Sequence, residues 1–166
     1  MAAPQHPPQS RQPASAERML TITRDFDVPR ALAFEVWTSP QHLVRWWGPR
    51  DADGLDFSTP SCEIDFRAGG KWRMCIQARD GMTLWQHGTY HEVVVPERLV
   101  FSFAWDNGAD AGVETLITVM FDELAPSKTR VTFTQTGFNS DPQRDGHITG
   151  WTQCLDRLYA YLEARK

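Results

Sequence analysis

The 166-residue sequence has few cysteines and no pattern that pairs them. Its three cysteines, Cys62, Cys75 and Cys154, are far apart, and no CxxC string occurs. This spacing indicates neither a disulfide framework nor a zinc ribbon. We therefore expect buried free thiols in a reducing cytoplasm, where disulfides are rare.

Long apolar runs and an excess of positive charge are also missing. No segment approaches the ~20 apolar residues that a membrane-spanning helix needs, and no charged stretch followed by an apolar block suggests a secretory signal. The formal charge is −4 and the pI is about 5.7, which disfavours a nucleic-acid-binding surface. We expect a cytoplasmic protein with no membrane span and no nucleic-acid partner.

The first part of the chain lacks the residues of a folded core. Residues 1–17 are rich in Pro, Gln, Ser and Ala, with no large apolar residue after Met1. Such a segment cannot bury enough apolar surface to offset the entropy lost on ordering. We predict a disordered tail over residues 1–17 and one folded domain over residues 18–166.

The predicted domain begins with a strand and two short helices. Residues 19–26 alternate apolar and polar side chains, as a half-buried strand does. Pro29 and Pro40 each stand where a helix can start, because the first turn does not need the N–H that proline lacks. Gly48 and Pro49 then end the second helix.

Six further strands are predicted, because apolar and polar residues alternate between turn signals such as Asp80-Gly81. The short links between them favour an antiparallel meander. The predicted strands cover about residues 62–67, 72–77, 84–95, 99–105, 114–124 and 128–136.

A long helix is predicted from Asp141 or Asp145 to Ala164. It has an apolar stripe, which must cover a large apolar surface, and the sheet is the only one available. The predicted fold class is therefore α+β, with a curved antiparallel sheet of about seven strands around this helix. The stripe contains Ile148, Trp151, Leu155, Leu158 and Leu162, and the opposite side holds Thr152, Gln153, Asp156, Arg157 and Glu163.

Four stretches of the sequence carry a family resemblance: residues 36–49, 65–72 (DFRAGGKW), 88–100 and 150–158. Together they resemble the START-like, or SRPBCC, superfamily, and within it the branch of activator of heat-shock-protein-ninety ATPase homologues. The resemblance implies the helix-grip fold, with a deep pocket between the concave face of the sheet and the long helix. Members bind lipids, hormones, polyketides and other apolar molecules, and some are cyclases or hydrolases. The eukaryotic proteins that name the branch activate a chaperone ATPase.

The sequence has seven tryptophans, which suggest a large aromatic core, a lined cavity, or both. Small-molecule pockets are mostly apolar with few polar groups, and this composition fits that profile. A filled core is the alternative for each ring. The predicted ligand-binding residues are Trp72, Met74, Trp85, Phe101, Phe103, Trp105, His147, Trp151, Leu155 and Leu158.

His147 is the most interesting polar residue of the predicted site. On a helical wheel it lies about 40° from Trp151 and about 20° from Leu158, inside the apolar stripe. The dipole at a helix N-terminus disfavours an imidazolium, so we expect a neutral ring. Two roles stay open: a structural histidine bonded to a loop carbonyl, or an acid–base pair with Glu114. We assign no catalytic residue.

Other polar residues carry weaker hypotheses. His87 and His91 would lie ~13 Å apart along one strand face, too far apart to share a metal ion. Asp65 and Arg67 are predicted to form an ion pair, and Gln135 is a candidate polar group inside the cavity. We expect neither a metal nor a cofactor.

Three functions are therefore considered. The first is binding of a small apolar or aromatic molecule, as a sensor, carrier or sequestering protein. The second is a cyclase or hydrolase that uses His147. The third is a protein-interaction module that docks through an exposed corner at Trp46 and Trp47. Gly150, which costs a helix about 1 kcal/mol relative to alanine, either allows a strand to approach or leaves room for a ligand.

Overall fold

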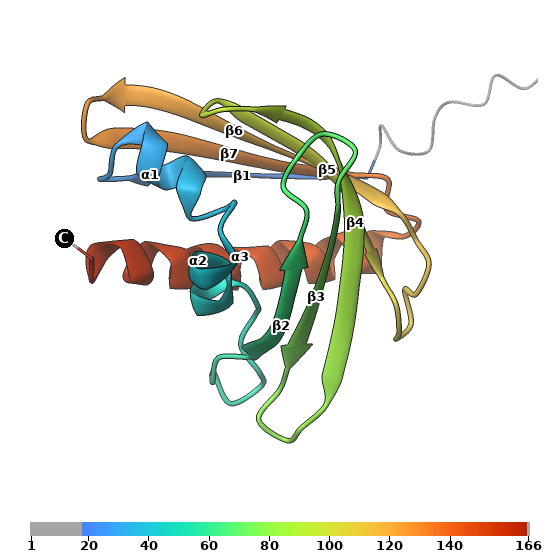
Figure 1. The fold of residues 1–166 in the computed structure, drawn as a ribbon. Coiled ribbons are helices and arrows are strands. Elements are labelled where there is room, and N and C mark those ends of the chain that lie inside the picture. Colours follow the sequence, from blue (N-terminus) through green and yellow to red (C-terminus); the bar gives the residue numbers. More distant parts are fainter. Residues whose placement is uncertain (1–17, 166) are drawn as a thin grey trace, which may run out of the picture.

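Residues 18–165 are described by a computed structural model, and they form one antiparallel sheet and three helices (Figure 1). The elements in chain order are β1 (Met19–Phe26), α1 (Arg30–Glu35), α2 (Pro40–Trp46), β2 (Ser58–Ile64), β3 (Lys71–Gln77), β4 (Thr83–Val94), β5 (Arg98–Trp105), β6 (Thr115–Ala125), β7 (Lys128–Thr136) and α3 (Asp141–Glu163).

The sheet has seven strands in the order β1-β7-β6-β5-β4-β3-β2. Strands β2 to β7 are a meander in which each strand pairs with the next one along the chain, as the short predicted links require. β1 pairs with the last strand, with Met19 opposite Thr136 and Phe26 opposite Thr129. The sequence-based prediction of about seven antiparallel strands is confirmed.

The sheet curves, and α3 runs along its concave side (Figure 1). α1 packs against β6 and β7, whereas α2 lies between β2 and α3. The core fills the space between these layers, and its largest fully buried rings include Trp46, Phe26, Phe103, Phe121 and Phe133. This arrangement is the predicted helix-grip fold.

α3 begins at Asp141, after an N-cap at Ser140 whose hydroxyl accepts a hydrogen bond from the Gln143 amide. Trp151, Leu155, Leu158 and Leu162 of the predicted stripe are buried, as expected.

Two residues of α3 contradict the predicted stripe. Ile148 is 38% exposed, although it was assigned to the apolar side, and Arg157 is 9% exposed, although it was assigned to the polar side. The buried side of α3 meets the loop after α2 as well as the sheet, and Arg157 finds its partners in that loop. A binary apolar pattern does not detect a buried charge that has such partners.

The predicted exposed corner at Trp46 and Trp47 is wrong. Trp46 is 0% and Trp47 is 3% exposed. The indole of Trp46 donates to the Val36 carbonyl, and its ring stacks edge-on against Trp37 with centroids 4.6 Å apart. Each indole body therefore packs in the core while its N–H finds an acceptor, which buried tryptophans require.

One smaller prediction is confirmed in part, and another falls outside the described residues. Asp65 and Arg67 form the predicted ion pair, with Nε and Oδ2 2.9 Å apart, but they follow the end of β2 instead of lying within a strand. The predicted tail, residues 1–17, lies outside the described residues.

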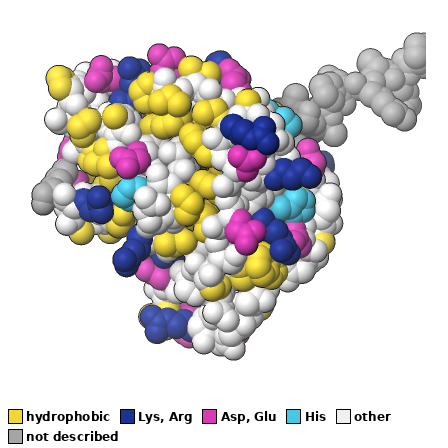
Figure 2. Space-filling view, viewed as in Figure 1, with side chains coloured by type: hydrophobic (Ala, Val, Ile, Leu, Met, Phe, Trp, Pro, Cys, Tyr) yellow, Lys and Arg dark blue, Asp and Glu magenta, His cyan; other side chains and the backbone are white. Residues whose placement is uncertain are grey.

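None of the helices in the described part of the chain has the length and apolar character that crossing a membrane requires. On the face shown in Figure 2, Lys and Arg side chains lie beside Asp and Glu side chains, so positive charge does not gather in one patch. The ion pairs of the described residues include Arg24–Asp156 and Arg130–Asp25.

Candidate functional site

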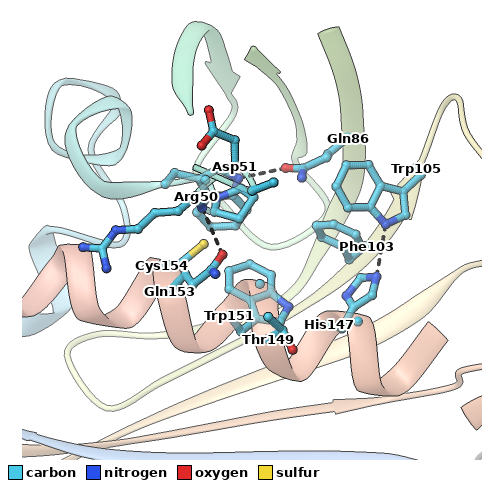
Figure 3. A pocket seen from close by; sticks show the side chains of 16 residues that line it. Arg50, Asp51, Gln86, Phe103, Trp105, His147, Thr149, Trp151, Gln153 and Cys154 are labelled. Carbon is cyan, nitrogen blue, oxygen red and sulfur yellow. Dashed lines mark hydrogen bonds between the residues drawn. The ribbon is translucent and has the colours of Figure 1, made fainter. Parts of the chain in front are cut away.

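A pocket of about 390 Å³ lies where the first half of α3 faces β4, β5 and the loop after α2 (Figure 3). Residues 47–52 of the loop form one side. Gln86 of β4 and two aromatic residues of β5, Phe103 and Trp105, form another. α3 contributes residues between Gly146 and Cys154.

Four of the ten predicted ligand-binding residues line this pocket: Phe103, Trp105, His147 and Trp151. Trp47 adds a further ring, with its centroid 5.0 Å from that of Trp151 and the two planes almost perpendicular. These rings come from β5, α3 and the loop, so the fold brings together side chains that are far apart in sequence.

The other six predicted residues lie outside the pocket lining. Five are buried in the core: Trp72, Met74, Phe101, Leu155 and Leu158. The sixth, Trp85, lies on the opposite face of the sheet, with the Arg73 guanidinium 4.0 Å above its ring.

Trp72 lies across Gly88 of β4, where an added Cβ would be 2.5 Å from the Trp72 Nε1 atom. Its indole N–H donates to the Ser102 carbonyl across 3.2 Å. The missing side chain at Gly88 therefore lets the Trp72 ring fill the core between the strands.

Glycines on α3 leave the pocket open on its helix side. Gly146 and Gly150 are about one helical turn apart, and both line the pocket. Apart from the adjacent residues and the backbone of α3 itself, an added Cβ at either position would meet no atom within 4 Å. Of the two explanations considered for Gly150, the structure supports open space over close approach to a strand.

A chain of hydrogen bonds runs from the pocket wall into the fold, and the direction of each bond follows from its donor. Trp105 Nε1 donates to His147 Nε2 across 3.1 Å (Figure 3). Since an indole can only donate, the His147 proton sits on Nδ1. That N–H donates to Gln135 Oε1, 3.2 Å away.

The chain continues into the sheet. Gln135 Oε1 also accepts from Trp151 Nε1 at 2.8 Å, which fixes the orientation of the amide. Gln135 Nε2 donates to Thr115 Oγ1 at 2.8 Å, and that hydroxyl donates to the Phe103 carbonyl at 3.0 Å. Gln135 is 0% exposed, so the predicted polar group inside the fold is present and its amide oxygen is engaged twice.

Burial lowers the pKa of His147 to about 4, although Asp110 opposes the shift. Removing the ring from water penalises its charged form, and both ring nitrogens have partners that suit the neutral tautomer. The ring is therefore neutral at physiological pH, as expected. Its acceptor is the side-chain amide of Gln135 and not the loop carbonyl that the sequence suggested.

The loop side of the pocket is held by Arg157 of α3. Its Nη1 donates to the carbonyls of Gly48 at 2.8 Å and of Trp47 at 3.3 Å. Its Nε lies 3.5 Å from Asp56 Oδ2. These bonds satisfy a buried guanidinium and tie the pocket loop to the helix.

Cys154 lies beside this loop at the pocket wall. Burial raises the pKa of its thiol to about 12, so the sulfur is uncharged at neutral pH. Cys62 and Cys75 are free thiols as well, and Cys75 is buried.

The remaining polar candidates do not meet at the pocket. Glu114 is exposed and outside the pocket lining, so it does not pair with His147. His87 and His91 are both exposed, and His87 pairs with Asp106. Among residues 18–165, no group of three or more His, Cys, Asp or Glu side chains is arranged to hold a metal ion.

With this geometry established, comparison with known proteins assigns the family. Residues 27–163 match the family model described as activator of Hsp90 ATPase homolog 1-like protein, AHSA1. The chain belongs to this family. Among proteins with curated functional descriptions, none matches the chain.

Several solved structures have the same fold as this chain. The AHSA1 protein of Silicibacter pomeroyi has 23% identity and a TM-score of 0.78 over 89% of this chain and 99% of that one. A protein of Nitrosomonas europaea has 24% identity and a TM-score of 0.73 over 90% and 97%. CalU16 of Micromonospora echinospora has 17% identity and a TM-score of 0.63 over 87% and 75%. At these identities, the likeness shows the fold alone.

The sequence strings that resemble the AHSA1 family mainly build the fold. In the DFRAGGKW string, an added Cβ at Gly70 would lie 1.9 Å from the Asp65 carbonyl oxygen, so the turn between β2 and β3 requires glycine. The Gly69 and Tyr90 amides then bond across to the neighbouring segment. Such contacts specify the turn and carry no information about a ligand.

Sequence reasoning missed several residues of the pocket. Gln86 is 4% exposed and faces inward, whereas its neighbour Trp85 faces outward. Gln153, assigned to the polar side of α3, lines the pocket and binds the Arg50 amide. Gln86 pairs with Met74, which is buried, and paired residues share one face of a sheet. The strand register therefore indicates that Gln86 faces inward, which hydropathy alone does not.

Proposed function

We propose that this protein binds a small apolar or aromatic molecule in the pocket between β4, β5 and α3, as a sensor, carrier or sequestering protein. The observation that carries this proposal is the open helix wall: Gly146 and Gly150 leave free space opposite the rings of Phe103, Trp105 and Trp47. Helix glycines cost about 1 kcal/mol each relative to alanine. Gly146 is exposed and Gly150 is half-buried, so both lie on the open side of the pocket, where a larger side chain would take up the space beside the rings.

The pocket has the composition expected for ligand binding. Its lining is mainly aromatic and apolar with a few polar groups, and its volume is about 390 Å³. Both are typical of small-molecule sites. The charged states of His147 and Cys154 are suppressed by burial, so an uncharged molecule meets no desolvated ion there.

Acid–base catalysis at His147 has less support. A general base needs a free lone pair within reach of its substrate, and His147 Nε2 already accepts from Trp105. The Nδ1 proton is engaged by Gln135, deeper in the fold. We interpret His147 as a structural and wall residue.

Docking of a protein partner through Trp46 and Trp47 loses its basis, because both rings are buried. The AHSA1 family is compatible with protein partners, and none is identified for this chain. The proposed setting for ligand binding is the cytoplasm, which the free thiols of Cys62, Cys75 and Cys154 support.

Filling the pocket from α3 tests the proposal. Gly150→Leu adds a side chain in the free space and should leave the fold intact, because no atom lies near its Cβ. The neutral fluorescent naphthyl ketone prodan should bind the wild type saturably at micromolar concentration, which is about −8 kcal/mol. The variant should bind it at least about tenfold more weakly, a loss of about 1.4 kcal/mol.

Ala160→Leu is the matched control, since Ala160 is an exposed residue of the same helix outside this pocket. It should bind prodan like the wild type. If the wild type shows no saturable binding of prodan or of a broad panel of apolar molecules, the proposal fails. Equal binding by Gly150→Leu and the wild type would show that the pocket is not the site.

A further inference from the structure

The amide of Gln86 is oriented by a neighbour that can only donate. Trp47 Nε1 lies 2.8 Å from Gln86 Oε1. Because an indole has no acceptor, the oxygen of the amide must face Trp47, and the NH₂ group faces the other way. Gln86 is 4% exposed, so this NH₂ group is held inside the fold.

The Gln86 NH₂ group has no hydrogen-bond partner among the described residues and faces the pocket. No hydrogen bond joins Gln86 Nε2 to another described residue. Among residues 18–165, only two side-chain polar atoms are both fully buried and without a partner, Trp37 Nε1 and Arg98 Nε. Gln86 Nε2 also has no partner but is not among them, so it is not fully buried and keeps contact with the pocket space. Gln86 lines the pocket, and its free N–H groups therefore point to whatever occupies that space.

Gln153 repeats this arrangement on α3. Its Oε1 accepts from the backbone N–H of Arg50 across 3.0 Å. A backbone N–H is also a donor only, so the amide oxygen of Gln153 must face it, and the Gln153 NH₂ group stays available to a ligand. In Figure 3, Gln86 lies beside Trp105 and Gln153 lies toward Arg50 and Cys154. The two donors thus come from different sides of one pocket.

Acceptor groups of the inner wall are already in use. His147 Nε2 accepts from Trp105, and Gln135 Oε1 accepts from Trp151 and His147. The Gly48 carbonyl accepts from Arg157, and the Pro49 carbonyl accepts from the Phe57 amide. Of these groups, the ones left free are donors, whereas acceptors of the lining with remaining capacity, the Thr149 hydroxyl and Asp51 Oδ2, lie on its exposed or half-buried part.

Charged groups near the pocket are directed elsewhere. The Arg50 guanidinium points away from the pocket and pairs with Asp56, with Nε and Oδ1 3.1 Å apart (Figure 3). Asp51 Oδ1 accepts from the Asp53 and Leu55 amides of its own loop. Among the described residues of this wall, an anionic ligand would find no free cation, and it would lie near the Asp51 carboxylate.

We propose that the ligand is a neutral aromatic molecule bearing hydrogen-bond acceptor oxygens, such as a ketone or an ether, and that Gln86 and Gln153 bind these oxygens. This inference rests on the proposed function and narrows it. The aromatic wall of Phe103, Trp105 and Trp47 takes the ring system. A donor left without an acceptor inside a pocket is costly, which favours molecules that supply one.

Two naphthalenes of nearly equal shape test the inference. 2-Acetylnaphthalene has a carbonyl oxygen where 2-isopropenylnaphthalene has a CH₂ group. The quantity to measure is the ratio of their dissociation constants, obtained by competition with prodan. The wild type should prefer the ketone. Gln86→Met removes the NH₂ group at similar side-chain length, so the variant's preference for the ketone should be about tenfold smaller than that of the wild type. Gln153→Met should lower it in the same direction.

Gln77→Met is the control, because Gln77 lies at the end of β3 outside the pocket lining. It should keep the wild-type ratio. If Gln86→Met does not fold, Gln153→Met at the half-buried position decides the result. 2-Naphthoate should bind the wild type at least tenfold more weakly than the ketone at pH 7.5.

The outcomes separate the two proposals. If both naphthalenes compete with prodan and the ratio is the same in all proteins, the assignment of acceptor oxygens is wrong and apolar binding stands. A preference for 2-naphthoate over the ketone would also overturn the inference. If neither naphthalene competes and prodan does not bind, the proposed function itself fails.

Discussion

Trp105 on β5 donates its indole N–H to Nε2 of His147 on α3, across 3.1 Å. This bond joins the sheet to the first half of the long helix at the pocket wall. Because the indole is a donor only, it selects the tautomer of His147 with the proton on Nδ1. A charged ring would have two donors and would lose this bond.

Stability should therefore depend on pH through His147. Its pKa is about 4 in the folded protein and 6.5 without the fold, so above pH 6.5 the ring is neutral in both states. As pH falls from 6.5 to 4, the unfolded chain takes up a proton that the folded one does not. The free energy of unfolding should drop by about 3 kcal/mol over this window from this group alone. Urea unfolding at pH 7 and pH 4.5 measures the loss.

His147→Gln isolates the contribution of this residue to the pH dependence. The variant has no titrating ring, so its stability deficit relative to the wild type should narrow as the pH falls from 6.5 to 4. A deficit that stays constant across this window would mean that His147 is protonated in the fold, contrary to the tautomer that Trp105 selects.

Trp151→Ala should affect both stability and binding. Trp151 is 5% exposed, stacks against Phe133 with centroids 4.5 Å apart, and donates to Gln135. Its removal should cost up to 3–5 kcal/mol, with less if the pocket already borders one face of the ring. Prodan affinity should fall as well. A full loss of stability with unchanged affinity would assign Trp151 to the core alone.

Arg157→Met tests how the pocket loop is held. The substitution leaves the Gly48 and Trp47 carbonyls without their buried donor, which should destabilise the fold by about 3 kcal/mol. It should also accelerate amide hydrogen exchange in residues 48–52. Arg157→Lys keeps the charge but not the forked donors and should recover only part of the loss. Unchanged exchange in the loop would show that Arg157 does not hold it.

Much of the fold follows from local patterns. The alternation of apolar and polar residues in 99–105 predicts which side of β5 is buried, and the apolar spacing in α3 does the same for the helix. The antiparallel order follows from the short links between strands. Ile148 and Arg157 were misassigned because the buried side of α3 depends on the loop after α2, and no local pattern describes that contact.

The pocket was harder to predict, because its polar residues look like surface residues in the sequence. Trp85 and Gln86 are adjacent in β4, and hydropathy selects the tryptophan as the inward residue. The structure has the reverse, since Trp85 packs under the Arg73 guanidinium and Gln86 binds Trp47. Only the tertiary partner of each side chain decides which one faces the pocket.

The most direct test of the account is to observe the indole N–H signals of the protein by NMR while prodan is added to saturation. Trp47, Trp105 and Trp151 line the pocket, whereas Trp37 and Trp85 do not. We expect saturable shifts of the first three signals, assigned from single Trp→Phe variants, with little change at the other two and no such shifts in Gly150→Leu. Saturable binding that shifts Trp37 or Trp85 while the three pocket signals stay in place would contradict it.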